Sequence, residues 1–145
     1  MARIRVFLAC AAATLVAACA TPPPPSPPPV PTVSIARLYE QPAERAFLNA
    51  MRLYEDGQHE RAETMFRRAL SAGLGDRHDV AMAHKHLAFI ACAYDRPADC
   101  EAAFRAAFAA DAGFQLTDAE VGHPIWGPVF KRVSAEEATR RPIAK

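Results

Sequence analysis

The sequence predicts an all-α fold built from helix–turn–helix units, and three observations lead to this prediction. Alanine is abundant and runs of β-branched residues are scarce, a composition that favours helix over strand. Apolar residues recur at three- and four-residue spacing from residue 46 onward, as they do along the buried face of a helix. A short apolar motif also returns 38 positions later, from residue 62 to residue 100.

Length and charge limit the classes of function that fit. The 145 residues predict one domain, and 51% hydrophobic and 23% charged residues are globular values. Seventeen basic and sixteen acidic side chains give a formal net charge of +1, whereas nucleic-acid binding needs a clustered basic face. We therefore expect no nucleic-acid partner.

Residues 1–18 have the three parts of a secretory signal peptide. Arg3 and Arg5 form a basic head, residues 6–16 form an apolar core, and small residues follow. The apolar run is shorter than the ~20 residues that a membrane-spanning helix needs. This length favours a cleaved signal over the alternative, a retained signal anchor.

The end of this signal, LVAAC at residues 15–19, resembles the lipobox of bacterial lipoproteins. The resemblance implies that Cys19 becomes the acylated N-terminus and anchors the chain in a membrane. Ala20 stands where an aspartate would imply retention in the inner membrane, so the expected location is the outer membrane, facing the periplasm. An ordinary cleavage site followed by a chance cysteine is the alternative.

Residues 19–33 are predicted to be a lipidated cysteine and a proline-rich tether. Eight of the chain's thirteen prolines lie between Pro22 and Pro31, where most positions lack a backbone N–H. Such a run favours polyproline II at ~3.1 Å per residue, which would hold the domain roughly 30 Å from the bilayer. A proline-rich ligand for an aromatic groove is the alternative function of this run.

Residues 34–112 are predicted to form two helical hairpins. A short helix is expected at 34–39, and Pro42 would end or kink it. Helices are expected from 42, around 62–70, at 80–94 and from 97, with turns at 56–58, 73–75 and 95–99. Residues 76–79 offer N-caps for the third helix, and Asp95 is the expected cap of the fourth.

The two hairpins resemble the tetratricopeptide repeat. Ala62-x-x-x-Phe66-x-x-Ala69 recurs around Phe104, and repeats of this family are helix–turn–helix units of about 34 residues. His84 and Cys100 depart from the residues that the family favours at these positions, as does Ala112. Because such arrays usually need three repeats, residues 113–145 are predicted to cover the open end with short helices, one opened by a Thr117–Glu120 capping box.

Two cysteines lie in the second hairpin and are predicted to pair. Export would bring Cys92 and Cys100 to an oxidising compartment, and their eight-residue separation across a helical turn suits a disulfide. Two buried free thiols are the alternative.

Other patterns that would indicate an enzyme are missing from the sequence. The five histidines show no helical spacing typical of a metal site, no serine lies in a Gly-x-Ser-x-Gly turn, and no glycine-rich phosphate loop is present. We expect a non-enzymatic protein with no cofactor and no small-molecule substrate.

A protein-binding face is the expected functional site. In tetratricopeptide repeats the first helix of each hairpin lines a groove, and the resemblance carries this role to six positions here. They are Phe47, Met51, Tyr54, Met82, Lys85 and Phe89. Trp126 is expected at the end of the same surface, and the alternative is that these residues form ordinary core under the C-terminal segment.

The order of parts also resembles the TssQ-type lipoproteins associated with bacterial type VI secretion. The lipobox, the proline tether and the degenerate repeats contribute, and GHPIWGP at residues 122–128 is the most specific part. The resemblance implies an adaptor that binds a subunit of the secretion apparatus and supports its assembly or anchoring. A general envelope chaperone or pilotin-like lipoprotein for an outer-membrane protein is the alternative.

Overall fold

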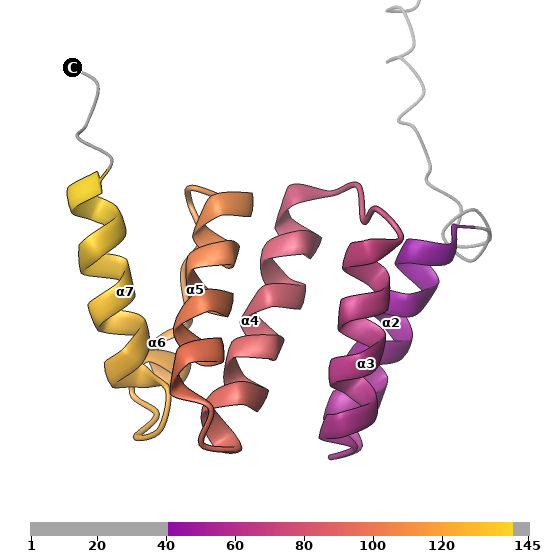
Figure 1. Cartoon of the computed structure of the whole chain (residues 1–145), viewed down its shortest axis with the longest axis horizontal. Coiled ribbons are helices and arrows are strands. Elements are labelled where there is room, and N and C mark those ends of the chain that lie inside the picture. Colours follow the sequence, from indigo (N-terminus) through magenta and orange to yellow (C-terminus); the bar gives the residue numbers. More distant parts are fainter. Residues whose placement is uncertain (1–40, 141–145) are drawn as a thin grey trace, which may run out of the picture. The chain divides into compact units, whose positions relative to one another are not determined.

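The computed structural model describes residues 41–140, and helices joined by turns and loops make up this part of the chain (Figure 1). The predicted signal peptide, Cys19, the tether and the helix at 34–39 lie outside the described residues. No strand occurs between residues 41 and 140, so the predicted all-α class is confirmed. With the labels of Figure 1, the helices are α2 (Pro42–Glu55), α3 (His59–Ser71), α4 (Arg77–Ala93), α5 (Pro97–Ala110), α6 (Asp118–Val121) and α7 (Gly127–Arg140).

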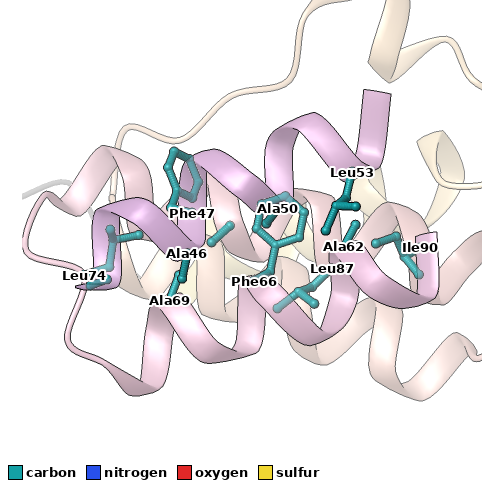
Figure 2. Packing of buried hydrophobic residues seen from close by; sticks show 12 residues of the cluster. Ala46, Phe47, Ala50, Leu53, Ala62, Phe66, Ala69, Leu74, Leu87 and Ile90 are labelled. Carbon is teal, nitrogen blue, oxygen red and sulfur yellow. The ribbon is translucent and has the colours of Figure 1, made fainter. Parts of the chain in front are cut away.

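Helices α2 and α3 form the first hairpin. Gly57 takes a φ of 73° in the turn between them, a conformation that glycine adopts without steric cost. Small side chains where the helices meet let the backbones approach, and Phe66 fills the space between them with no exposed surface (Figure 2). Its ring meets the edge of Phe47 at 6.1 Å between centroids. Ala62 and Ala69 are also fully buried, as their spacing from Phe66 predicts.

Helices α4 and α5 form the second hairpin, and the cap of α4 agrees with the sequence. The Asp76 carboxylate accepts hydrogen bonds from the backbone N–H groups of His78 and Asp79. The prediction that Asp95 caps α5 is wrong, because the N-cap is Arg96, which makes no side-chain cap bond. Asp95 instead takes a φ of 55° in the turn, the left-handed conformation that aspartate tolerates better than most residues.

A bidentate ion pair ties the second hairpin to the first. Arg96, at the start of α5, donates hydrogen bonds of 3.0 and 2.7 Å to the two carboxylate oxygens of Glu63 in α3. This geometry suits guanidinium and carboxylate especially well. It lowers the pKa of Glu63, an effect that the hydrogen bond from Arg96 dominates.

Residues beyond α5 fold back over the second hairpin. The Thr117–Glu120 capping box opens α6 as predicted, with both reciprocal hydrogen bonds present. Helix α7 packs on α5, and Phe130 lies 5.4 Å from Phe104 and 5.7 Å from Phe108 between ring centroids. Two ion pairs join the same helices, Arg105 to Glu136 at 2.8 Å and Arg132 to Glu101. The C-terminal segment therefore covers one side of the hairpin array.

Gly127 sets how closely α7 can follow α6. A Cβ atom added to Gly127 would lie 2.3 Å from the backbone oxygen of Val121, which cannot move aside as a flexible side chain could. Gly75 is the matched control, since a Cβ there meets nothing within 4 Å. We expect Gly127→Ala to lower the free energy of unfolding by about 1–3 kcal/mol. Gly75→Ala should change it by at most about 0.5 kcal/mol in the same urea titration, and equal effects would contradict the packing described.

Candidate functional site

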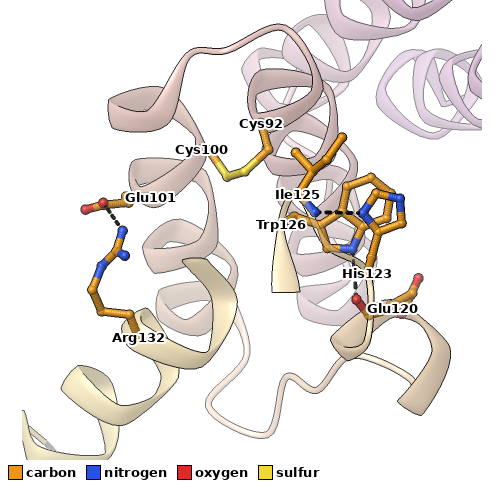
Figure 3. Close-up of a disulfide and its surroundings, with 8 residues drawn as sticks. All are labelled: Cys92, Cys100, Glu101, Glu120, His123, Ile125, Trp126 and Arg132. Atoms are coloured by element: carbon orange, nitrogen blue, oxygen red, sulfur yellow. Dashed lines mark hydrogen bonds and ion pairs between the residues drawn. A yellow bond between two sulfur atoms is a disulfide. The ribbon is translucent and has the colours of Figure 1, made fainter. Parts of the chain in front are cut away.

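Cys92 and Cys100 lie on facing helices at the turn of the second hairpin (Figure 3). Their Cα atoms are 5.2 Å apart and their sulfur atoms are bonded, which closes a small ring around residues 92–100. Cys100 is fully buried, and the backbone N–H of Arg96, inside the ring, donates to the carbonyl oxygen of Ala91 just before it. A bridge of this loop length stabilises a domain by about 2–3 kcal/mol.

The seven residues expected to bind a partner do not form one open face. Phe47, Lys85 and Phe89 are buried, whereas Met51, Tyr54, Met82 and Trp126 are half-buried. Phe47 packs in the first hairpin against Phe66. Glu120 and Trp126 of the C-terminal segment cover Lys85 and Phe89, as in the core alternative, whereas Phe47 is buried within the first hairpin.

Trp126 covers the second hairpin by lying on Phe89. The two rings stack at 4.3 Å between centroids with 20° between their planes, and His123 in turn stacks on Trp126. The indole Nε1 donates a 2.9 Å hydrogen bond to the backbone oxygen of Glu120 (Figure 3). The polar end of the indole is thus satisfied while its ring seals apolar surface.

Glu120 also supplies a carboxylate to Lys85 at 2.7 Å. The carboxylate is held in place because its second oxygen accepts the backbone N–H of Thr117 in the capping box. Burial opposes ionisation of Glu120, but the hydrogen bonds from Lys85 and Thr117 outweigh it and lower the pKa of the carboxyl. The charge of Lys85 is therefore paired with that of Glu120 under the C-terminal segment, and its Nζ lies 5.6 Å from the centroid of Phe89.

His86 is a buried histidine held neutral at the centre of the domain. Its Nδ1 lies 2.7 Å from the carbonyl oxygen of Met82, which can only accept, so Nδ1 carries the proton. The ring stacks on Phe66 at 5.2 Å and meets Tyr54 edge-on at 4.7 Å. Burial lowers the pKa of His86 from 6.5 to about 4, and it raises the pKa of Tyr54, with a smaller contribution from the charge of Glu120.

A groove on the first hairpin was not predicted from the sequence. The groove lies along α2 and α3 and holds about 400 Å³. We call it the arginine-rimmed groove; its rim is Arg45, Arg52 and Arg68, and the apolar residues Ala46, Leu48 and Met65 also line it. The seven-residue spacing of Arg45 and Arg52 was the available signal, but arginines at exposed helical positions are usual on a solvated surface.

Other kinds of site find no support in the described part of the chain. Between residues 41 and 140, no three His, Cys, Asp or Glu side chains are grouped so that they could hold a metal ion. None of the helices in this range is both long and apolar enough to cross a membrane. No protein-family model, curated protein or solved structure matches the chain.

The two roles of Glu120 can be separated by substitution. Glu120→Gln keeps a side chain that can complete a capping box but has no charge for Lys85, whereas Glu120→Ala loses both roles. We expect Glu120→Ala to lower the free energy of unfolding by about 1 kcal/mol more than Glu120→Gln does. Urea titration followed by fluorescence of the single tryptophan measures both. Glu55→Ala, at an exposed position, is the control, and equal losses from the two Glu120 variants would contradict a contribution of the capping box.

The burial of His86 predicts how stability depends on pH. Above pH 6.5 His86 is neutral in both the folded and the unfolded chain, and its contribution to the free energy of unfolding is complete. Below pH 6.5 the unfolded chain binds a proton at this histidine, whereas the folded chain does not bind it until about pH 4. Stability should therefore fall on acidification, by roughly 3 kcal/mol over this range from His86 alone. His86→Phe should lose less stability than the wild type between pH 7 and pH 4 in urea titrations. His78→Phe, an exposed control, should follow the wild type, and identical pH profiles for all three proteins would exclude the role assigned to His86.

Proposed function

We propose that this chain is a non-enzymatic lipoprotein adaptor of the bacterial outer membrane. Cys19 would anchor it, the proline-rich run would space it from the bilayer, and the helical domain would bind a protein of the envelope. The bound protein would be a subunit of a type VI secretion apparatus, whose assembly or anchoring the adaptor supports.

The cysteine pair of the second hairpin is the observation that carries the envelope assignment. Cys92 and Cys100 lie at bonding distance across the α4–α5 turn, and such bridges persist in exported proteins but are rare in the cytosol. The lipobox-like LVAAC run independently points to export, because it ends a signal-like segment. Two unrelated parts of the chain thus agree on the compartment.

Support for an adaptor comes from how the helices are arranged. Two hairpins packed side by side leave helix faces at the end of the array that carries α2, and an open groove lined by arginines and apolar side chains lies there. Helical surfaces of this kind receive segments of other proteins. A subunit of the secretion apparatus is proposed as the partner only because the chain resembles TssQ-type lipoproteins. The most specific part of that resemblance is the run at residues 122–128, in which Trp126 packs on Phe89 and Gly127 lies close to Val121.

Anchoring and oxidation can be tested together in cells. Radioactive palmitate should label the wild type but not Cys19→Ser, which should leave the membrane fraction. Cys92 and Cys100 should resist alkylation until a reductant is added, because the disulfide blocks both thiols. Palmitate labelling that survives Cys19→Ser would refute the anchor, and alkylation without reductant would remove the observation on which the envelope assignment rests.

Crosslinking in intact cells, followed by mass spectrometry, tests the partner class. Crosslinks from the helical domain to subunits of the secretion apparatus support the proposal. Crosslinks confined to outer-membrane proteins in transit would overturn it in favour of the chaperone or pilotin alternative. Cys19→Ser is the matched control, since crosslinks that depend on anchoring should be lost with it.

A further inference from the structure

We infer that the arginine-rimmed groove binds an amphipathic helix of a partner protein whose apolar stripe is flanked by acidic side chains. The inference deepens the proposed function by naming the surface and the chemistry of the partner. It also moves recognition away from the α4 face, where Lys85 and Phe89 are already covered.

One apolar side chain that lines the groove, Leu48, is not covered by the described chain. Leu48 is 44% exposed although it lies in the middle of α2, and it is one of few large apolar side chains so exposed between residues 41 and 140. Met65 of α3 is half-buried and also lines the groove, whereas Ala46 is buried. A partner that brought apolar side chains here would remove this surface from water.

The charge on the rim selects the partner. Arg45 and Arg68 form no ion pair with any described residue, and Arg52 reaches Asp56 only at 4.0 Å with most of its side chain exposed. Among the described residues that line the groove none is acidic, although the two helices together carry several acidic side chains. Guanidinium groups favour carboxylates, which they bind through paired hydrogen bonds.

The spacing on the rim fits a helix. Arg45 and Arg52 are seven residues apart on α2, which places them about 10.5 Å apart along its axis, close to two turns. A facing helix with acidic residues seven apart would present carboxylates at the same interval. The 14 residues of α2 extend about 21 Å, so a partner helix of about four turns would span the groove.

Two other occupants fit the charge less well. Residues 34–40 of this chain contain apolar side chains, but their one acidic residue, Glu40, is balanced by Arg37. A second copy of the chain would bring the same three arginines against the rim, and like charges at close range repel. The arginines therefore favour a partner that supplies negative charge.

A pair of synthetic peptides tests the inference. Both are 14-residue amphipathic helices with a leucine stripe; one has glutamates on its flanks, and the other has lysines at the same positions. The protein is the mature chain with Cys19→Ser, exported so that Cys92 and Cys100 can oxidise. Fluorescence anisotropy should give the acidic peptide a Kd on the order of 10–100 µM, at least about tenfold tighter than the basic peptide, and weaker at high salt.

Charge reversal supplies the decisive comparison. The double variant Arg45→Glu/Arg68→Glu should bind the basic peptide better than the acidic one, whereas Arg77→Glu, on an exposed arginine of α4, should behave as the wild type. Circular dichroism of each variant confirms that the helices remain. The inference is wrong if wild type binds neither peptide, or binds both equally.

The competing occupants have their own signatures. Binding of the acidic peptide that appears only after residues 34–40 are deleted would assign the groove to that segment and overturn the inference. A wild-type dimer in sedimentation velocity that is absent in the double variant would assign the groove to a second copy of the chain and would also overturn the inference. If the groove does not bind the acidic peptide, palmitate labelling and envelope crosslinks should still be observed. The failure of this inference can therefore be distinguished from the failure of the proposed function.

Discussion

The burial of helix α4 is the constraint on which the rest of the described domain depends. Its residues 85–91 are all buried, so each side of the helix requires a covering element. Helices α2 and α3 cover one side and α5 another, and the segment around Trp126 covers what the hairpins leave open. The two buried polar side chains of this stretch also have partners: Lys85 pairs with Glu120, and His86 donates a hydrogen bond to the carbonyl oxygen of Met82.

The hairpin architecture was predictable because local signals and packing agree there. Alanines and phenylalanines at helical spacing gave the buried faces of α2, α3 and α5, and Gly57, Asp76 and the Thr117–Glu120 pair marked turns and caps. Asp95 was misassigned, since aspartate suits both an N-cap and a left-handed turn and only the folded backbone distinguishes them. Membership of the hairpins in the tetratricopeptide class stays a prediction.

The candidate site was less predictable because it depends on contacts between distant residues. Helix α4 is apolar on most of its circumference, so periodicity could not say whether Phe89 faced a partner or a later part of the same chain. The pairing of Lys85 with Glu120 spans 35 positions, and no local pattern specifies it. The arginine-rimmed groove was not predicted for the opposite reason: each of its charges is ordinary alone, and only the folded chain brings the three arginines to one groove with no acid among its described lining residues.

The covalent ring of the second hairpin has a mechanical consequence beyond its own stability. Arg96 lies inside the loop that Cys92 and Cys100 close, and its guanidinium donates two hydrogen bonds to Glu63 of the first hairpin. Because the ring restricts the backbone that carries Arg96, the oxidised pair also limits the positions from which that guanidinium can reach Glu63. Reduction would remove this restriction, whereas the apolar cluster that α4 shares with the first hairpin through Ala83, Leu87 and Ile90 would still join the two hairpins.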